Sequence, residues 1–441
     1  MPPMRSEAVG FRERAVPAAG ARALVVGMGR SGLALARFLA ARGVGVRMAD
    51  LRPPAQLGDA LAGLPPGTET VLGGYDGAAI DGCAAVYASP GVPWDIDLLQ
   101  TARSSGLTVS SEMDLFFRLC PASIVGVTGT NGKTTTTALL GSVLAQGPRP
   151  VLVGGNIGDT VLDRLEELTP EHWVVLELSS FQLESCERPR ARIGVVLNVT
   201  PDHLDRHTTM EAYAAAKARL LRSQEPGDDA VLNGLDHACR EMAGLTRARV
   251  TWFDRHQPVP PMRLPGRHNR LNALAAAAAG RAAGLSDEAI EAGVRTFQGV
   301  EHRLELVGEW GDVRWYNDSK ATNPDAGLVG LRAFDGVPVV LIAGGYGGGF
   351  ELGEWLAAAR SGTRAAVLVG ASAAELAEGL TGHPVHQAAT LEEAVERAHA
   401  LAQPGDVVLL SPAYKSFDMF ANYEERGRRF KAAVRGIHGT G

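Results

Sequence analysis

Residues 126–135 read Gly-Val-Thr-Gly-Thr-Asn-Gly-Lys-Thr-Thr; they follow the apolar residues 123–125 and open a helical pattern at Lys133. A strand, a glycine-rich turn and a helix N-terminus in this order form a phosphate cradle, because free backbone N–H groups and the positive end of the helix dipole converge there. Lys133 adds a charge for the β- and γ-phosphates, and the Thr134 hydroxyl is placed to bind Mg²⁺. The stretch predicts a nucleoside triphosphate site, although Val127 replaces the glycine of the general phosphate-loop pattern.

Composition and charge describe an ordinary protein of several domains. The chain has 441 residues, 45% hydrophobic and 21% charged, so two or three domains with their own cores are expected. A formal net charge of -6 disfavours a nucleic-acid partner. Residues 1–20 lack the apolar core of a secretory signal, and no stretch approaches the ~20 apolar residues that cross a bilayer, so no membrane association is expected.

The cysteines stand too far apart in sequence for a C-x-x-C metal or redox pair: Cys83, Cys120, Cys186 and Cys239. They fit small buried hydrophobes in a reducing compartment. The sequence therefore predicts a cytoplasmic protein, and we expect it to be a monomer.

Strand and helix patterns alternate along the chain, which is typical of parallel α/β layers. The pattern predicts a loosely ordered extension at 1–20 and domains at 21–118, 119–302 and 303–441. A long alanine-rich helix is expected after Asn269. Strands are expected at 23–26, 44–49, 84–88, 173–178, 193–197, 313–316, 337–343, 366–369 and 407–410.

The first domain opens on a second glycine turn, in which residues 27–32 read Gly-Met-Gly-Arg-Ser-Gly, and Asp50 stands 18 residues past Gly32. This spacing occurs in dinucleotide-binding folds. Because such turns hold any diphosphate near a helix N-terminus, the pattern predicts either NAD or another diphosphate, including that of a UDP-sugar. The loop 89–93, which contains Gly91, follows a strand and is either a ligand-binding loop or an ordinary turn.

Polar residues of the second domain also occupy candidate binding positions. Glu177 ends an apolar strand, where a carboxylate beside a phosphate loop is the usual second Mg²⁺ contact, or else a solvated strand end. His203, in the loop after the next strand, either binds a metal or substrate oxygen or caps the loop. Asn156 lies among glycines that let a ligand approach the backbone. Lys217 falls on the apolar stripe of a helix, where it is unfavourable unless paired or chemically changed, or else extends outward from the stripe's edge.

Charged residues gather where the second and third domains join, at Arg303, Asp318 and Lys320. The two cations would reach a γ-phosphate and neutralise developing charge, although a polar interdomain loop would look similar. Together these pieces resemble the Mur ligase family over essentially the whole chain after residue 20. The resemblance rests on Gly-Thr-Asn-Gly-Lys-Thr, Glu-Leu-Ser-Ser-Phe-Gln-Leu, Asn-Val-Thr-Pro-Asp-His-Leu-Asp, Gly-Arg-His-Asn-Arg-Leu-Asn, Glu-His-Arg, Asn-Asp-Ser-Lys-Ala-Thr-Asn and Leu-Ser-Pro-Ala.

The resemblance implies three α/β domains: an N-terminal Rossmann-like domain that binds UDP, a central P-loop-type ATPase domain, and a C-terminal Rossmann-like domain that closes over the amino-acid site. It implies ATP contacts from Gly129, Thr130, Asn131, Gly132, Lys133, Thr134, Thr135, Asn269, Asn272, Arg303 and Asp318. It implies substrate contacts from Arg30, Ser31, Asp50, Gly91, Asn156, His203, Lys320, Thr322, Lys415, Ser416 and Tyr423. Two Mg²⁺ ions would be bound by Thr134, Glu177, His203 and Lys217, with Lys217 carbamylated into an anion.

The activity implied is ATP-dependent, ADP-forming ligation of glutamate to UDP-N-acetylmuramoyl-L-alanine in peptidoglycan synthesis. Phosphoryl transfer would activate the substrate carboxylate, and the amine of glutamate would attack the acyl phosphate to give a tetrahedral intermediate that expels phosphate. This chemistry needs mainly positioning and charge neutralisation. The resemblance assigns them to Lys133, Lys217, His203, Lys320 and Arg303.

One region departs from the family's pattern. Where these ligases usually carry Gly-Gly-x-Asp-Lys-Gly, residues 344–349 read Gly-Gly-Tyr-Gly-Gly-Gly, and Lys415 stands where a small residue is usual. D-Glutamate is the usual acceptor, but the altered loop leaves L-glutamate open. A folylpolyglutamate-synthetase-like ligase would share only the ATP domain, an NAD-dependent dehydrogenase explains only residues 23–50, and a nucleotide-gated binding protein would not need Lys217.

Overall fold

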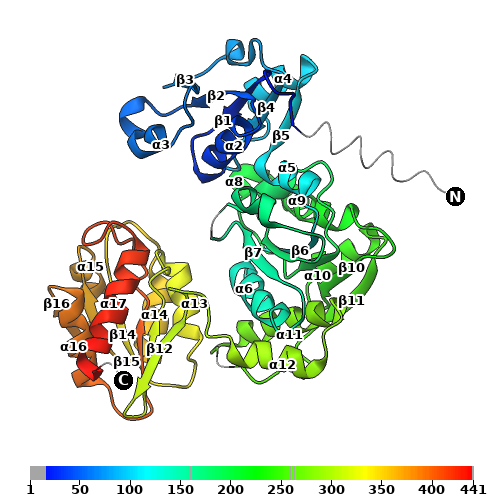
Figure 1. The fold of residues 1–441 in the computed structure, drawn as a ribbon. Coiled ribbons are helices and arrows are strands. Elements are labelled where there is room, and N and C mark those ends of the chain that lie inside the picture. Colours follow the sequence, from blue (N-terminus) through cyan, green and yellow to red (C-terminus); the bar gives the residue numbers. More distant parts are fainter. Residues whose placement is uncertain (1–15, 159, 259, 263, 440–441) are drawn as a thin grey trace. The chain divides into compact units, whose positions relative to one another are not determined.

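The computed structural model describes residues 16–158, 160–258, 260–262 and 264–439, so most of the expected extension at 1–20 lies outside the described residues. The strands form three separate sheets, and helices connect most of the strands of each sheet (Figure 1). The chain up to residue 260 forms one compact unit together with residues 272–294. Residues 261–271 and 295–441 form the other.

The N-terminal sheet has five parallel strands in the order β3-β2-β1-β4-β5. Ala23 and Val25 face α2, whereas Leu24 and Val26 face α4, because alternate side chains of a strand point to opposite faces. The strand order reverses at β1, where sheets of this type bind ligands. The elements are β1 (Arg22–Val26), α2 (Arg30–Ala40), β2 (Gly45–Asp50), α3 (Gly58–Ala62), β3 (Glu69–Leu72), β4 (Ala85–Ala88), α4 (Asp97–Ser104), β5 (Thr108–Ser111) and α5 (Glu112–Leu119).

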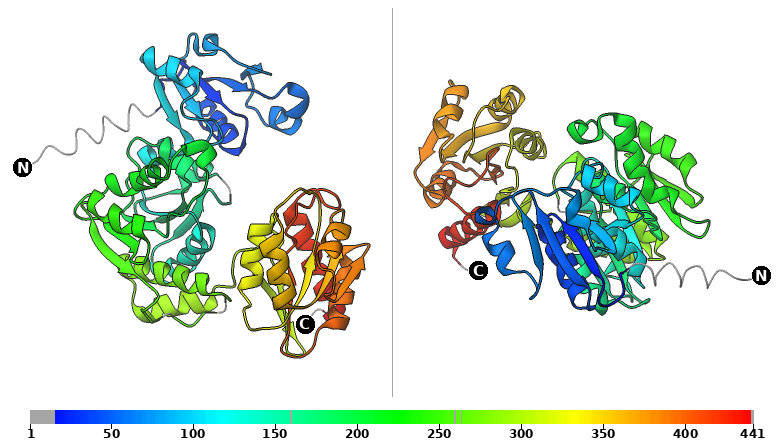
Figure 2. Two further views of the ribbon diagram at one scale, coloured as in Figure 1. Left: turned by 180° about the vertical axis from the view of Figure 1, so that it is seen from behind. Right: turned by 90° about the horizontal axis from the view of Figure 1, so that it is seen from above.

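The central sheet has six parallel strands in the order β11-β10-β9-β6-β8-β7, seen from two further directions in Figure 2. Its inner strands are continuous apolar runs because both faces are covered. The elements are β6 (Ser123–Thr128), α6 (Lys133–Leu144), β7 (Val151–Gly155), β8 (Trp173–Glu177), α7 (Ser180–Glu184), β9 (Ile193–Val196), α8 (Leu204–His207), α9 (Met210–Arg222), β10 (Asp229–Asn233), α10 (His237–Met242), β11 (Arg249–Phe253), α11 (Arg267–Ala282) and α12 (Asp287–Thr296).

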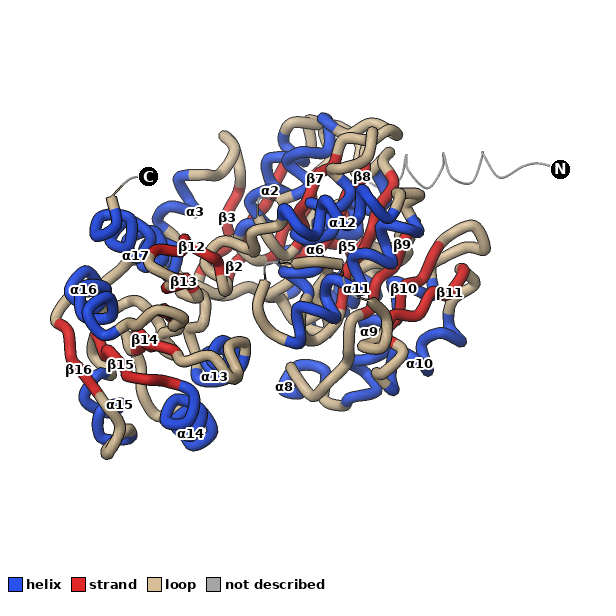
Figure 3. Tube along the Cα trace, turned by 90° about the horizontal axis from the view of Figure 1, so that it is seen from below, coloured by secondary structure: helices blue, strands red, loops and turns tan. Residues whose placement is uncertain are grey.

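The C-terminal sheet has the order β12-β13-β17-β14-β15-β16, and β12 alone of these strands is antiparallel to its neighbour. Helices α13, α14 and α15 lie on one face of this sheet and α16 and α17 on the other (Figure 3). Their buried side chains pack into two separate clusters, one on each face. The elements are β12 (Glu305–Trp310), β13 (Val313–Asn317), α13 (Pro324–Arg332), β14 (Val339–Ala343), α14 (Gly353–Gly362), β15 (Thr363–Val369), α15 (Ala373–Gly379), β16 (Val385–Ala388), α16 (Leu391–Leu401), β17 (Val407–Leu410) and α17 (Tyr423–His438).

These sheets confirm the predicted parallel α/β layers, with the ends of the predicted strands shifted by at most three residues. The alanine-rich helix begins at Arg267, two residues before the predicted position. All four cysteines are free and buried. Across the described residues, no helix combines the length and apolar character that crossing a bilayer requires.

Candidate active site

The phosphate loop joins β6 to α6 at the point where the central sheet changes direction, with β8 on one side of β6 and β9 on the other. Gly129 and Gly132 have φ angles of 152° and 85°, a region that favours glycine. A side chain on Gly132 would also meet the Asn272 amide oxygen at 2.4 Å. Val127 is a fully buried residue of β6, so the turn itself begins at Gly129, and the departure from the general pattern falls in the strand.

Lys133 lies across this loop. Its ammonium donates hydrogen bonds to the carbonyl oxygens of Gly129 (3.0 Å) and Thr130 (2.7 Å). Thr134 follows it in the first turn of α6 and is buried. Asn198, at the end of the neighbouring strand, accepts the Asn131 N–H at 2.8 Å and donates to the Asn131 carbonyl at 3.1 Å. The loop is therefore held from both sides with a cation at its helix end.

Glu177 ends β8 and is only 3% exposed. Its Oε1 accepts a hydrogen bond from the Asn156 amide at 3.0 Å, which fixes the carboxylate, whereas its Oε2 is buried and has no hydrogen-bond partner. A buried carboxylate oxygen without a donor is unfavourable unless a cation is bound there. Glu177, paired in register with Val127 beside the phosphate loop, and the Thr134 hydroxyl offer the hard oxygen ligands that Mg²⁺ prefers.

Lys217 is 1% exposed on α9, which confirms the inward position read from its helix stripe. Its Nζ donates to the Gly129 carbonyl at 2.8 Å and lies 4.3 Å from the centre of the Tyr213 ring. Burial, and secondly the nearby charge of Lys133, lower the pKa of Lys217 to about 7. A large fraction of this amine is therefore uncharged and nucleophilic near neutral pH.

His203 precedes α8 in a left-handed conformation, with φ 52°. Its ring lies 4.9 Å from that of Phe181 and 6.3 Å from that of Tyr213, measured between ring centres. The Tyr213 hydroxyl lies 3.2 Å from the Thr130 hydroxyl. His203 and Lys217 thus both pack against Tyr213, which also lies beside Thr130 of the phosphate loop. The sequence did not predict this role, because the helical spacing of Tyr213 is that of an ordinary core residue.

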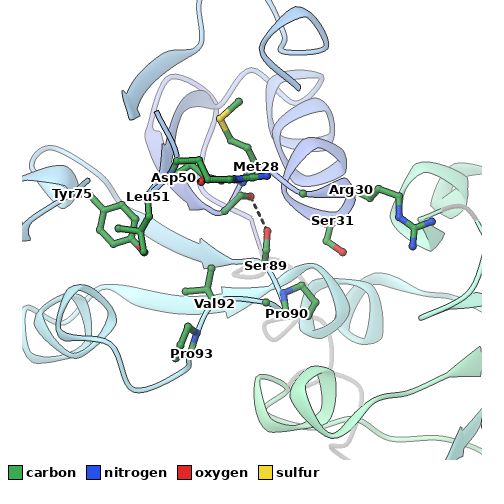
Figure 4. A pocket seen from close by; sticks show the side chains of 14 residues that line it. Met28, Arg30, Ser31, Asp50, Leu51, Tyr75, Ser89, Pro90, Val92 and Pro93 are labelled. Carbon is green, nitrogen blue, oxygen red and sulfur yellow. Dashed lines mark hydrogen bonds and ion pairs between the residues drawn. The ribbon is translucent and has the colours of Figure 1, made fainter. Parts of the chain in front are cut away.

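A pocket of about 430 Å³ opens at the carboxyl end of β1 (Figure 4). Of the predicted substrate residues, Arg30, Ser31, Asp50 and Gly91 line it, but Asn156 and His203 do not. Gly32 is needed there because a side chain would lie 1.9 Å from the Gly27 carbonyl oxygen.

Asp50 and Arg30 are both engaged by protein atoms. The carboxylate of Asp50 accepts the Met28 N–H at 2.7 Å and a forked pair from Arg52 at 2.9 and 2.7 Å, and the hydrogen bonds from Arg52 hold its pKa well below the usual range. Arg52, half-exposed, also lines the pocket and was not predicted. Arg30 turns toward the central domain, where it donates to the Gly158 carbonyl at 3.0 Å (Figure 4).

The second compact unit holds another group of predicted residues. Arg303 stands between His302 and Leu304, which have φ angles of 64° and 43°, so the turn that presents it is strained. Asp318 is buried, and its two oxygens accept the Leu304 N–H (3.2 Å) and the Ser411 hydroxyl (2.9 Å). Burial raises the pKa of Asp318 to about 7. Lys320 places its ammonium 5.8 Å from the centre of the Tyr423 ring.

Other predicted residues divide between the two units. Asn269 donates to the Pro265 carbonyl at 2.6 Å within the second unit, whereas Asn272 lies against the phosphate loop in the first. Thr135 is buried in the first turn of α6. In the second unit Ser416 is buried, Lys415 is exposed and Thr322 is partly exposed.

Family models match all three parts of the chain: the MurD-like N-terminal domain of Mur ligases at 21–111, their middle domain at 127–259, and their glutamate ligase domain at 302–414. Relatives named UDP-N-acetylmuramoylalanine–D-glutamate ligase match nearly the whole length. The one from Solibacter usitatus is 45% identical over 95% of this chain and 98% of its own, and the one from Pelotomaculum thermopropionicum is 41% identical over 94% and 97%. The chain belongs to the Mur ligase family.

Solved Mur ligases share the fold of this family member. MurF from Acinetobacter baumannii aligns with a TM-score of 0.59 at 18% identity, covering 97% of this chain and 98% of its own. The UDP-N-acetylmuramate-alanine ligase of Thermotoga maritima gives 0.58 at 18% identity, with 95% and 99% covered. The predicted three-domain architecture is confirmed, as is an ATP-dependent, ADP-forming ligase. The glycine turn at residues 27–32 belongs to a MurD-like N-terminal domain, not to a dehydrogenase.

Proposed function

We propose that this Mur ligase joins glutamate to UDP-N-acetylmuramoyl-L-alanine, with cleavage of ATP to ADP and phosphate, in peptidoglycan synthesis. The observation that carries the proposal is the identity of 41–45% to several relatives of that named activity over 93–95% of this chain. The pocket at the end of β1 has the glycine turn that a UDP diphosphate needs. The phosphate loop offers a site for the triphosphate of ATP.

The chain's own residues supply positioning and charge for phosphoryl transfer from ATP to the substrate carboxylate. Lys133 and the loop N–H groups would bind the phosphates, while Thr134 and Glu177 would hold Mg²⁺, which neutralises phosphate charge when bound. Arg303 and Lys320 are proposed to stabilise charge that develops on the transferred group. The amine of glutamate would then attack the acyl phosphate and expel inorganic phosphate.

We propose further that Lys217 is carbamylated and, with His203, holds a second Mg²⁺. Its lowered pKa supports this, because only the neutral amine adds to carbon dioxide. Carbamylation would replace a buried, partly cationic group with an anion beside the cationic Lys133. Mass spectrometry under native conditions with bicarbonate should detect a 44-dalton adduct that a Lys217→Met variant lacks.

The acceptor loop is the part of the site that differs from the family. At Gly348, where the family usually carries a lysine, a β-carbon would lie 3.9 Å from a Glu375 carboxylate oxygen. The loop of Lys415 pairs with this glycine loop through the Tyr346 N–H, which donates to the Lys415 carbonyl at 2.7 Å. We propose that Lys415 supplies the missing charge to the glutamate carboxylate, with D-glutamate as the acceptor and L-glutamate as the alternative.

The test is phosphate release with UDP-N-acetylmuramoyl-L-alanine and either enantiomer of glutamate. The proposal expects release that requires ATP, Mg²⁺, the UDP-linked substrate and one enantiomer together. Release with NAD-linked or folate substrates in their place would contradict it. Four free, buried thiols support a cytoplasmic location, and the predicted monomer is checked by sedimentation.

A further inference from the structure

Arg426, on α17, is a buried cation that the reaction outlined above does not use. Arg426 is only 2% exposed, whereas the other arginines of α17 are exposed to solvent. Burial lowers its pKa to about 10, so it remains charged at neutral pH. A buried charge persists only where it is extensively hydrogen-bonded.

The hydrogen bonds of Arg426 all go to two loops of the second unit. Nε donates to the Ser319 hydroxyl at 3.0 Å, and Nη2 donates to the Ser319 carbonyl at 2.9 Å and the Tyr414 carbonyl at 3.1 Å. Nη1 donates to the Lys415 carbonyl at 3.3 Å. One planar guanidinium thus ties the residue before Lys320 to the residue before Ser416.

None of these acceptors is a carboxylate. Asp418 acts on Arg426 through its charge, and among the described residues no ion pair joins the two side chains. An arginine that served only to anchor the helix would be satisfied more strongly by an acid. Four neutral acceptors instead give a fixed fork geometry that sets the distance between the two loops.

The surrounding glycines show how closely the helix and loops meet. A β-carbon on Gly345 would lie 2.2 Å from the Lys415 carbonyl oxygen and 3.0 Å from Nη1 of Arg426. A β-carbon on Gly427, the next residue of α17, would lie 2.1 Å from the His302 ring. The glycine loop, the Lys415 loop, the Lys320 loop and the turn before Arg303 therefore all meet at Arg426 and Gly427.

We propose that Arg426 is a positioning residue for the acceptor amino acid, which sets the spacing of Lys320 and Lys415 by gripping the backbone beside each. The inference rests on the proposed function, because it takes these two lysines to face the incoming glutamate. It assigns Arg426 no contact with substrate. Its loss should weaken binding of glutamate, because the two loops would no longer be held in one geometry.

The experiment measures steady-state phosphate release for Arg426→Met and Arg426→Lys. Hydrogen bonds to a charged group are stronger than those between neutral groups, so their loss should loosen both loops. The KM for glutamate should therefore rise about tenfold in the methionine variant. The lysine variant keeps the charge but not the fork, so its KM for glutamate should also rise. The KM for the UDP-linked substrate, which is proposed to bind in the first unit, should stay within about twofold.

Arg429→Met is the matched control, because Arg429 lies on the same helix and makes an exposed ion pair with Glu392. Its kinetic constants should match those of the parent enzyme. Should Arg426→Met fail to fold, Ser319→Ala removes the Nε acceptor, together with the hydrogen bond of the Ser319 hydroxyl to the Tyr423 carbonyl, and should still raise the KM for glutamate.

A fall in kcat with an unchanged KM for glutamate would overturn the proposal. That result is expected if the substitution only destabilises the fold, because it then lowers the amount of active enzyme without changing how glutamate binds. Restoration of the parent KM by Arg426→Lys would also overturn it, because charge alone would then suffice. Parent enzyme that releases no phosphate with either glutamate enantiomer would instead refute the proposed function, so the two failures are distinct.

Discussion

Two glycine-rich loops of this Mur ligase look alike in sequence but are built for different tasks. The phosphate loop runs directly into α6 with Lys133 at its end, so its amides and a cation converge on one point. The glycine loop at 344–349 has no cation, and α14 begins only at Gly353. Its first two glycines are required by packing, because side chains there would lie 2.1 Å from the Val369 carbonyl and 2.2 Å from the Lys415 carbonyl. Glycine thus permits another group to approach the backbone closely in both loops. The charge beside the loop decides whether that group is a ligand phosphate or a neighbouring part of the chain.

The strongest test of this contrast removes the cation from the phosphate loop. Lys133→Ala should lower kcat/KM for ATP-dependent ligation by about 10²–10³, the usual loss when one stabilising contact of a transition state is removed. Phosphate release measures the effect, with Arg429→Ala as a control that should keep its activity, because the exposed side chain of Arg429 on α17 forms an ion pair with Glu392. Turnover near the parent rate would mean that the loop does not bind the triphosphate.

The second test asks whether the first half of the other loop serves packing. Gly345→Ala combines a φ of 147° with a contact of 2.2 Å to a carbonyl oxygen, so it should destabilise the second unit by about 2–4 kcal/mol. Chemical denaturation followed by tryptophan fluorescence, to which Trp310, Trp315 and Trp355 of the second unit contribute, measures the change. Gly348→Ala is the matched control and should change stability by less than about 0.5 kcal/mol, because no backbone atom lies near its β-carbon.

The phosphate loop also differs in having a second, buried lysine against its Gly129 carbonyl. The folded-state pKa of Lys217 is lowered to about 7 from 10.5, so between these values the unfolded chain binds the extra proton. Unfolding free energy should therefore rise with pH from 7 toward 10.5, by at most about 1.4 kcal/mol per pH unit from this group. Lys217→Met should flatten that rise in a denaturation series without bicarbonate, and an equal slope in both proteins would contradict the assignment.

The smallest expected effect comes from giving the second loop a cation. Gly348→Lys should lower the KM for the accepted glutamate enantiomer about threefold, since an exposed charge pair contributes about 0.5–1 kcal/mol. The uncharged Gly348→Gln variant separates charge from bulk and should leave the KM unchanged. A lowered KM that persists at high salt, or that also occurs in the Gly348→Gln variant, would contradict charge complementarity.

Sequence patterns recovered what is local in this molecule. The apolar run before residue 126 and the glycines after it indicated strand, turn and helix, and the apolar stripe of its helix favoured an inward position for Lys217. The partners of these residues come from distant segments, and sequence spacing carries no signal for them. Lys217 meets a carbonyl 88 residues away, and Glu177 is fixed by Asn156, which follows the neighbouring strand β7.

Tertiary contacts also engage two acidic residues that the resemblance assigns to ligand binding. Asp50 and Asp318 are strand-end acids that a pattern marks as ligand contacts, yet their oxygens are taken by Met28 and Arg52, and by Leu304 and Ser411. The burial of Arg426 could not be predicted from the sequence, because an arginine on a polar helix is expected to be exposed to solvent. Its burial depends on Ser319 and Tyr414, which come close only in the folded sheet.

The placement of the cysteines gives this enzyme a built-in reporter. All four thiols belong to the first compact unit, none to the second, and burial raises the pKa of Cys186 and Cys239. Alkylation by a reagent in solvent must therefore wait for the first unit to open, while melting of the second leaves it untouched. Three of the six tryptophans lie in the second unit. A labelling time course, which follows the first unit alone, compared with tryptophan emission, which follows both units, would therefore give the order in which the two units unfold.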